Sequence, residues 1–108
     1  MRKIERLMNA AITNGTDWKQ DNTEVVNIDG VSFVYLHGNK IAEVGEGFIR
    51  LYDGGYQSNT TKSRLNAILS EHGLPGEGIF QKNFEWFITL RTSGGLDTVP
   101  FFSSMRIA

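Results

Sequence analysis

The stretch "SNTTKSRLNAIL", which begins at Ser58, combines hydroxyl groups and cations at the start of a predicted helix. Ser58, Asn59 or Thr60 can cap that helix, because a side-chain oxygen there can accept a backbone N–H that the first turn leaves free. The helix macrodipole favours acidic side chains in the first turn, yet the chain supplies Lys62 and Arg64 and no acid. Free N–H groups, hydroxyls and cations are the components of a phosphate site.

This pattern gives an anion-binding hypothesis with an alternative beside it. The alternative is that acidic side chains of the segment 21–57 neutralise the cations, or that the cations are solvated, since exposed ion pairs contribute only about 0–1 kcal/mol. Aromatic side chains could stack on the bases of a nucleic acid, although each is also a normal core or hairpin residue. The hypothetical anion site comprises Ser58, Thr60, Thr61, Lys62, Ser63 and Arg64, and the possible aromatic contacts are Trp18, Tyr52 and Tyr56.

No other motif predicts chemistry. The sequence lacks a Gly-x-Ser-x-Gly elbow, a Walker loop and the His-x-Glu spacing of deaminases, so we expect no catalytic residue and no cofactor. The segment Asp53-Gly54-Gly55 is more typical of a turn than of a metal site. His37 precedes the predicted turn Gly38-Asn39, where its ring can bond the backbone, and we favour that role over metal ligation.

Length and composition predict one globular domain spanning residues 1–108. The chain has no cysteine, which excludes disulfides, thiol nucleophiles and thiolate metal clusters. No apolar run approaches the roughly 20 residues that span a bilayer, and the charged start "MRKIERLMNA" does not resemble a signal peptide. We therefore expect a cytosolic protein that does not bind membranes.

The net charge of -1 argues against a general nucleic-acid coat protein, because such proteins carry a basic excess. The charge is uneven, at +2 for residues 1–20, -4 for residues 21–57 and +1 for residues 58–108. The acidic middle could face a basic partner, but a solvated surface is the more common reason for such a charge distribution.

Apolar periodicity predicts the elements that position these residues. Helical spacing predicts a first helix at about residues 2–13, ended by Gly15. From Thr23 the pattern alternates, and the turn signals Asp29-Gly30 and Gly38-Asn39 predict a meander. Its strands are "TEVVNI", "VSFVYLH", "KIAEV" and "GFIRLY", and the second strand carries apolar groups on both faces, as a strand covered on both sides would.

A second helix is predicted from the capping residues to about His72, ending at Gly73. The strands "EGIFQ" and "FEWFITLRT" then flank Lys82-Asn83, with Phe84 on the apolar side of the longer strand. After a glycine hinge, the apolar segment 101–107 must dock on the core or form an interaction surface, and docking is the simpler expectation. The predicted fold is α+β: an antiparallel sheet of a four-strand meander plus a C-terminal hairpin, with two helices packed on it.

Three stretches, "DNTEV", "YLHGNKIAEV" and "TTKSRLNAIL", resemble a family of small bacteriophage-encoded proteins. The shared pattern is an N-terminal helix, an "NT" strand start, a "LHGN-IA" hairpin, a Gly-aromatic pair and "TT-SR-NA-L" at the head of a helix. The likeness covers most of residues 22–69. It implies a viral accessory protein that acts in the cytoplasm of a bacterial host.

The functional hypothesis is a non-enzymatic phage accessory protein that binds a host macromolecule, foremost a host protein, and so modulates host metabolism or defence. The alternative is a nucleic-acid or nucleotide binder that uses the start of the second helix, and its affinity would fall steeply with salt. A third possibility is a small enzyme, which would need a pocket lined by converging polar groups.

Overall fold

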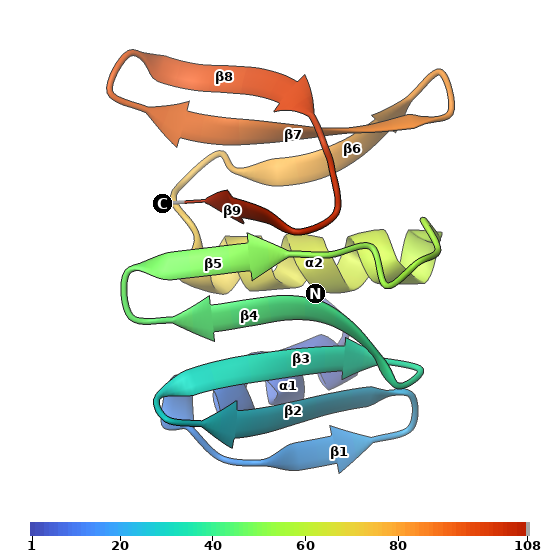
Figure 1. The fold of residues 1–108 in the computed structure, drawn as a ribbon, viewed down its shortest axis with the longest axis vertical. Helices are drawn as coiled ribbons and strands as arrows, with labels where there is room; N and C mark the ends of the chain where they lie inside the picture. Colours follow the sequence, from blue (N-terminus) through green and yellow to red (C-terminus); the bar gives the residue numbers. More distant parts are fainter. Residues whose placement is uncertain (108) are drawn as a thin grey trace.

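Residues 1–107 form two helices and nine strands in antiparallel sheets, which confirms the predicted α+β class (Figure 1). The structure, a computed structural model, describes residues 1–107. In chain order the elements are α1 (Lys3–Asn14), β1 (Trp18–Gln20), β2 (Thr23–Ile28), β3 (Val31–Leu36), β4 (Asn39–Gly45), β5 (Phe48–Leu51), α2 (Asn59–His72), β6 (Gly78–Lys82), β7 (Glu85–Thr92), β8 (Gly95–Pro100) and β9 (Met105–Ile107).

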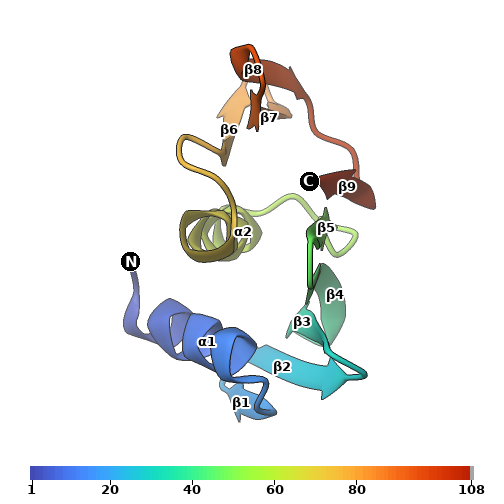
Figure 2. The same cartoon turned by 90° about the vertical axis from the view of Figure 1, so that its left-hand side faces the viewer.

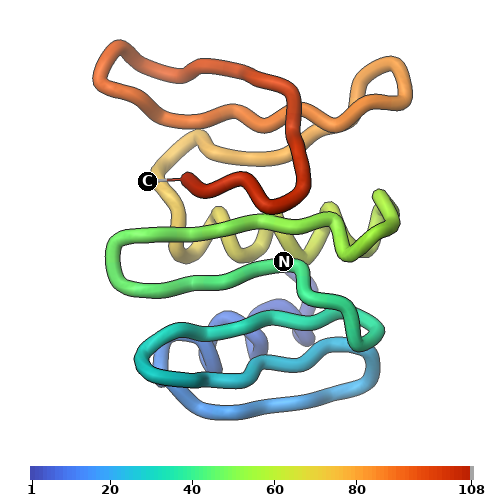
Figure 3. The backbone as a smooth tube through the Cα atoms, in the orientation of Figure 1, coloured from blue at the N-terminus to red at the C-terminus, as the bar shows by residue number. Residues whose placement is uncertain are grey.

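The larger sheet has six strands in the order β1-β2-β3-β4-β5-β9, and its centre is the predicted four-strand meander. The last strand returns from the far end of the molecule to pair with β5, with Ile107 opposite Ile49 and Met105 opposite Leu51 (Figure 3). Phe101, Met105 and Ile107 are buried. The C-terminal apolar segment therefore docks on the chain's own sheet.

Both helices lie on the same side of the six-stranded sheet (Figure 2). On β3, Ser32, Val34 and Leu36 face the helices and are buried, whereas Phe33 and Tyr35 on the opposite face are half-buried. The expectation that this strand is covered on both faces was therefore wrong. Its outward apolar side chains are covered in part by neighbouring side chains of the same sheet rather than by another layer.

The C-terminal hairpin does not join the larger sheet as predicted. Strands β6, β7 and β8 form a separate three-stranded sheet, and α2 contacts both β4 of the larger sheet and β6 of the smaller one. Ile79, Trp86 and Ile88 of the smaller sheet are buried, and the Trp86 ring meets Phe101 edge-on at a centroid distance of 5.5 Å. Helix α2 thus lies between two sheets and connects their cores.

Two predicted turns lie one residue away from their expected positions. Positive φ angles fall on His37 and Gly38, not on Gly38 and Asn39, and on Asn83 and Phe84, not on Lys82 and Asn83. Phe84 is therefore a turn residue that is 94% exposed instead of a core-facing strand residue. In both cases strand pairing fixes the turn, and the local preference of Gly and Asn gives way to it.

Candidate functional site

The start of α2 is capped as the sequence predicts. Ser58 has extended backbone geometry, and its Oγ accepts a hydrogen bond from the Thr61 N–H at 3.1 Å. The hydroxyl of Thr61 lies 2.9 Å from the same Oγ and also donates to the Tyr56 carbonyl at 3.4 Å. Tyr56, Ser58 and Thr61 thus meet at a small cavity of about 120 Å³. The hydroxyls of this end of the helix are used mainly within the protein.

Arg64 points into the protein and not toward solvent. The residue is 3% exposed, and its guanidinium nitrogen Nη1 lies 2.9 Å from Glu5 Oε2 of α1. Its Nε donates to Thr23 Oγ1 at 3.1 Å, and its Nη2 donates to Asn22 Oδ1 at 3.4 Å. The cluster of Arg64, Glu5, Thr23 and Asn22 ties both helices to the start of β2, so Arg64 has a structural role here.

Glu5 accepts two further hydrogen bonds. Ser63 Oγ donates to its Oε2 at 2.6 Å, and the backbone N–H of Arg2 donates to its Oε1 at 3.2 Å. Burial alone would raise the pKa of this carboxyl, but hydrogen bonds from Ser63, Arg2 and Arg64, with the charge of Arg64, outweigh burial and lower it. Glu5 is therefore held as a carboxylate and neutralises Arg64.

The partner of Arg64 comes from an unexpected part of the chain. The expected partners were acids of segment 21–57, whereas the acid that pairs with Arg64 is Glu5 of the first helix. A usable signal was present, since Glu5 is three residues before Met8 and four before Asn9, and Met8 and Asn9 are buried on one helix face. Within residues 1–107 Lys62 forms no ion pair, so it is the cation of this helix start that could still meet an external anion. Anion binding there stays a prediction.

The three candidate aromatic residues do not share a surface. Trp18 is half-buried and packs against the core, while Tyr56 is 76% exposed in the loop before α2. Tyr52 lies beyond β5, where its hydroxyl donates to Glu43 Oε2 at 2.6 Å and Lys40 Nζ stands 4.5 Å from the centre of its ring. A single nucleic-acid strand could not stack on all three aromatic rings at one site.

Lys40, Glu43 and Tyr52 form a polar cluster on the outer face of the six-stranded sheet. Lys40 Nζ lies 2.6 Å from Glu43 Oε2, and this hydrogen bond is the main cause of the raised pKa of Lys40. Burial would raise the pKa of Glu43, but the bonds from Lys40 and Tyr52 outweigh it and lower that pKa. The cluster is self-neutralising and covers the aromatic faces beneath it.

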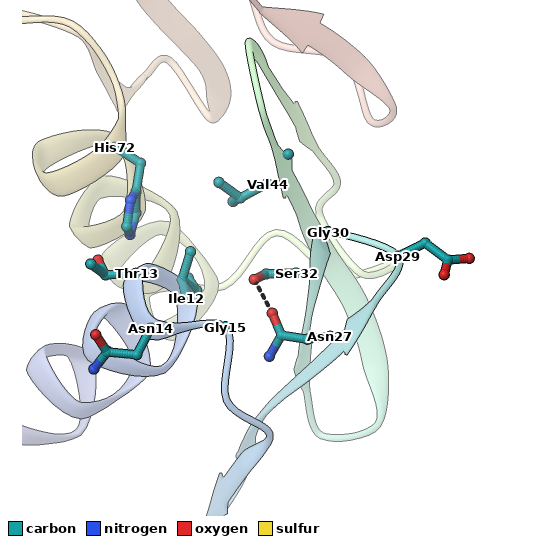
Figure 4. Close-up of a pocket in the computed structure, with 11 residues that line it drawn as sticks. Ile12, Thr13, Asn14, Gly15, Asn27, Asp29, Gly30, Ser32, Val44 and His72 are labelled. Atoms are coloured by element: carbon teal, nitrogen blue, oxygen red, sulfur yellow. Dashed lines mark hydrogen bonds between the residues drawn. The ribbon is translucent and has the colours of Figure 1, made fainter.

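A cavity of about 440 Å³ opens at the carboxyl ends of the two helices (Figure 4). The hydroxyl of Ser32 donates to Asn27 Oδ1 on its wall, and Asp29 at its rim points away from it. No lysine or arginine among residues 1–107 lines this cavity. Its walls therefore suit a neutral polar molecule better than a phosphate group.

His72 at the end of α2 lines this cavity and a neighbouring one of about 430 Å³. Its Nε2 is buried and has no hydrogen-bond partner among residues 1–107. Burial lowers the pKa of His72, and the nearby Glu71 charge opposes that shift only in part. Because solvent does not reach Nε2, a ligand in the cavity could not bond this atom unless the ring rotated.

The outer face of the three-stranded sheet exposes several apolar side chains. Phe80, Phe87 and Pro100 are opposite one another across β6, β7 and β8, and the rings of Phe80 and Phe87 stack at 5.7 Å. Phe80 is 40% and Leu96 is 51% exposed. We call this surface, made of Phe80, Phe87, Leu96 and Pro100 together with the exposed Phe84 at the tip of the β6–β7 hairpin, the phenylalanine face.

Phe84 at the tip of the β6–β7 hairpin is both exposed and strained. Its φ of 65° lies in the left-handed region, where a bulky side chain costs about 1–3 kcal/mol. Glycine or asparagine normally occupies that position of such a turn. The turn thus holds a large apolar side chain in solvent in a costly backbone conformation.

Comparison with known families identifies the chain's kinship. A family model described as Kyanoviridae Gp96 protein matches residues 1–108. The chain belongs to this phage protein family. The match confirms the phage kinship, and the hairpin and helix motifs that suggested it stay predictions. No curated protein and no solved structure matches the chain.

Two further findings on this Gp96 family member concern metals and membranes. Among residues 1–107, no three His, Asp or Glu side chains come together in a way that could hold a metal ion. Neither helix in that part of the chain is long and apolar enough to cross a membrane.

Proposed function

We propose that this phage protein is a non-enzymatic accessory protein that binds a host protein in the bacterial cytoplasm and so modulates host metabolism or defence. The observation that carries the proposal is the phenylalanine face, which is apolar, exposed and concentrated on one small sheet. Monomeric proteins rarely expose apolar patches of this kind without a binding role. The partner would offer an apolar recess for Phe84 and a flatter apolar surface for Phe80 and Phe87.

Charge on the phenylalanine face favours a protein over a nucleic acid. Lys82 and Glu85 face each other across β6 and β7, and Arg91 is the remaining cation of this face. A protein surface that binds nucleic acid needs an excess of Lys and Arg to displace the counterions of the phosphate groups. Aromatic residues beside isolated arginines are instead typical of the centre of protein interfaces.

The alternative function is nucleic-acid or nucleotide binding at the start of α2. Two features support it: Lys62 has no ionic partner within residues 1–107, and Tyr56 is exposed in the loop before α2. What weakens it is the burial of Arg64 against Glu5, because one cation is a poor basis for phosphate affinity.

The proposal is tested by capture of host proteins from lysate on immobilised wild-type chain and on two variants. Phe84→Gly removes the exposed ring and relieves the turn, so the fold is retained while capture should fall at least about tenfold, as for the loss of a central aromatic contact. The matched control Tyr56→Ser removes another exposed aromatic side chain and should leave capture unchanged.

Nuclease treatment separates the two functions. Host-protein binding at the phenylalanine face is insensitive to nuclease and to Lys62→Ala. Capture that disappears with nuclease and weakens with Lys62→Ala supports the alternative. Capture that survives both Phe84→Gly and Phe80→Ser would contradict the assignment of this face.

A further inference from the structure

Within residues 1–107 the two sheets have four edge strands, and three of them carry features that hinder further pairing. β1 and β9 at the ends of the larger sheet are each three residues long and carry Lys19 and Arg106. At β6 the side chain of Asn66 bonds both peptide groups of Ile79, accepting from its N–H at 2.6 Å and donating to its carbonyl at 2.9 Å. Short length, a cation and a side-chain cap are recognised protections against edge-to-edge association.

The edge of β8 has few such protections. This strand has six residues from Gly95 to Pro100, and its last five residues are all exposed. Asp97 is its single charged residue, and it has no lysine or arginine. In Figure 1 β8 lies at the outer end of the molecule, and no other strand of residues 1–107 lies beyond it. Pro100, at the end of the strand, is the remaining edge feature.

The register shows which peptide groups of β8 are free. The N–H of Phe101 donates to the Trp86 carbonyl at 2.9 Å, which places Phe101 in a hydrogen-bonded pair with β7. Hydrogen-bonded pairs alternate along antiparallel strands, so the peptide groups of Leu96, Thr98 and Pro100 point away from β7 to the open edge. Proline has no N–H to donate, and it falls on the outward side, where edge strands tolerate it.

We propose that β8 pairs with β8 of a second copy of this chain, antiparallel and centred on Thr98, to form a continuous sheet across a symmetric dimer. In this register Thr98 is opposite Thr98 of the second copy, and the two residues exchange both of their backbone hydrogen bonds. The Leu96 N–H donates to the carbonyl of Pro100 in the other copy. The Leu96 carbonyl, which faces a proline, stays hydrated.

The side chains of β8 are self-complementary in this arrangement. Leu96 is opposite Pro100 on the face that carries Thr98, and Asp97 is opposite Val99 on the other face. No like charges are opposite each other, although such pairs are the usual barrier to self-pairing of a strand. Leu96, which is 51% exposed, gains the Pro100 ring of the second copy as an apolar neighbour. The net charge of -1 adds little repulsion between copies.

The two-fold axis of the dimer would be perpendicular to the joined sheet. Both phenylalanine faces would therefore lie on the same side of that sheet. This inference does not depend on the proposed function, because it concerns the purified chain alone. If the host-protein proposal also holds, the dimer presents two binding surfaces to one partner, and its avidity exceeds that of a single surface.

Cysteine cross-linking provides a direct test, because the natural chain has no cysteine. The Cα atoms of a hydrogen-bonded antiparallel pair are about 5.5 Å apart, within the range that a disulfide bridges. Purified Thr98→Cys should form a disulfide-linked dimer under mild oxidation. Ser93→Cys, at the exposed tip of the same hairpin but away from the axis, is the matched control and should cross-link far more slowly.

Sedimentation of the untagged protein gives the second readout. The wild type should pass from the 12.1 kDa monomer to a species of twice that mass as concentration rises. Thr98→Lys sets two ammonium groups opposite each other and should raise the dimer dissociation constant about tenfold or more. Thr98→Val also loses the hydroxyl contact to Thr89, which is 3.0 Å long in the wild type, and should keep the dimer.

Three outcomes would overturn the proposal. The first is a wild type that stays monomeric at every concentration reached. The second is equal cross-linking of Thr98→Cys and Ser93→Cys, which would report random collision. The third is a dimer that Thr98→Lys leaves unchanged, because its interface would then lie elsewhere. If the open edge pairs with a strand of another protein instead, the purified chain remains a monomer and the first outcome is observed.

Discussion

The six-stranded and the three-stranded sheet differ in how completely their faces and edges are covered. Helices cover the inner face of the larger sheet, its edge strands are short, and buried polar contacts join it to both helices (Figure 2). The smaller sheet is supported from α2 mainly through β6, while β8 and the phenylalanine face stay open. In the larger sheet, polar groups and apolar side chains find their partners within the chain. In the smaller sheet, backbone groups of an edge strand and several apolar side chains stay exposed.

Buried charge illustrates the closed region. Arg64 and Glu5 would each be costly to bury alone, yet together with Thr23 and Ser63 they satisfy one another. On the outer face Lys40 and Glu43 form a comparable pair that is partly hydrated and so contributes less. The buried Arg64–Glu5 pair therefore helps to specify the fold, whereas the Lys40–Glu43 pair only covers aromatic rings on the outer face.

Arg64→Ala should change the free energy of unfolding more than any other substitution considered below. The substitution leaves the Glu5 carboxylate buried without its cation, so the free energy of unfolding should fall by about 3–5 kcal/mol. Chemical denaturation measures this loss. The double variant Glu5→Leu, Arg64→Met should recover much of it, because neither charge then remains buried. A loss near zero for Arg64→Ala would show that the cluster is hydrated.

Ile68→Ala tests whether α2 joins the two sheets. Ile68 is fully buried in the helix, and its truncation should lower the free energy of unfolding by about 2–5 kcal/mol. Both sheets should lose protection against hydrogen exchange together. Lys62→Ala on the half-buried side of the same helix is the control, with an expected change within about 0.5 kcal/mol. Unequal loss between the sheets would mean that they unfold separately.

The elements that the sequence predicted are those with long, regular patterns. The first helix and the four meander strands follow from periodicity within one or two residues. Capping chemistry limited the start of α2 to Ser58, Asn59 or Thr60, and the structure has Ser58 as the cap. Strands β1, β8 and β9 were not predicted, because β1 and β9 are only three residues long and the glycines before β8 indicated a hinge. Those glycines lie in the β7–β8 turn region.

The candidate site was less predictable than the fold, for a physical reason. Whether Arg64 meets solvent or Glu5 depends on how α1 and α2 pack, and the two residues are far apart in the sequence. The phenylalanine face was hidden for a similar reason, since Phe84 fits the alternating pattern of its strand until pairing places it in the turn. Local patterns specify elements, whereas tertiary pairing decides which side chains stay exposed.

Phe84→Gly in the smaller sheet should stabilise the protein, whereas Arg64→Ala and Ile68→Ala should destabilise it. Glycine accepts a φ of 65° without strain, and the ring that it removes contributes little burial at 94% exposure. The free energy of unfolding should rise by about 1 kcal/mol. Thermal denaturation at fixed protein concentration measures it, and Asn83→Gly at the neighbouring turn position is the control with a smaller gain. A destabilised Phe84→Gly would mean that the ring packs on the chain.

His72 should produce the smallest effect, and pH separates it from the other titrating groups. Burial lowers its folded-state pKa below the ordinary value of 6.5, so folding opposes protonation, and stability falls as pH decreases below that value toward the folded pKa. Glu5 and Glu43 also have lowered pKa values, but their contribution is lost only as pH falls below about 4.5. Between those ranges, His72→Gln should flatten the decline in unfolding free energy that urea denaturation records for the wild type. If the wild-type stability is constant from pH 7 to pH 5, the folded protein protonates this imidazole without cost. The end of α2 would then be exposed to solvent, as the edge of β8 is.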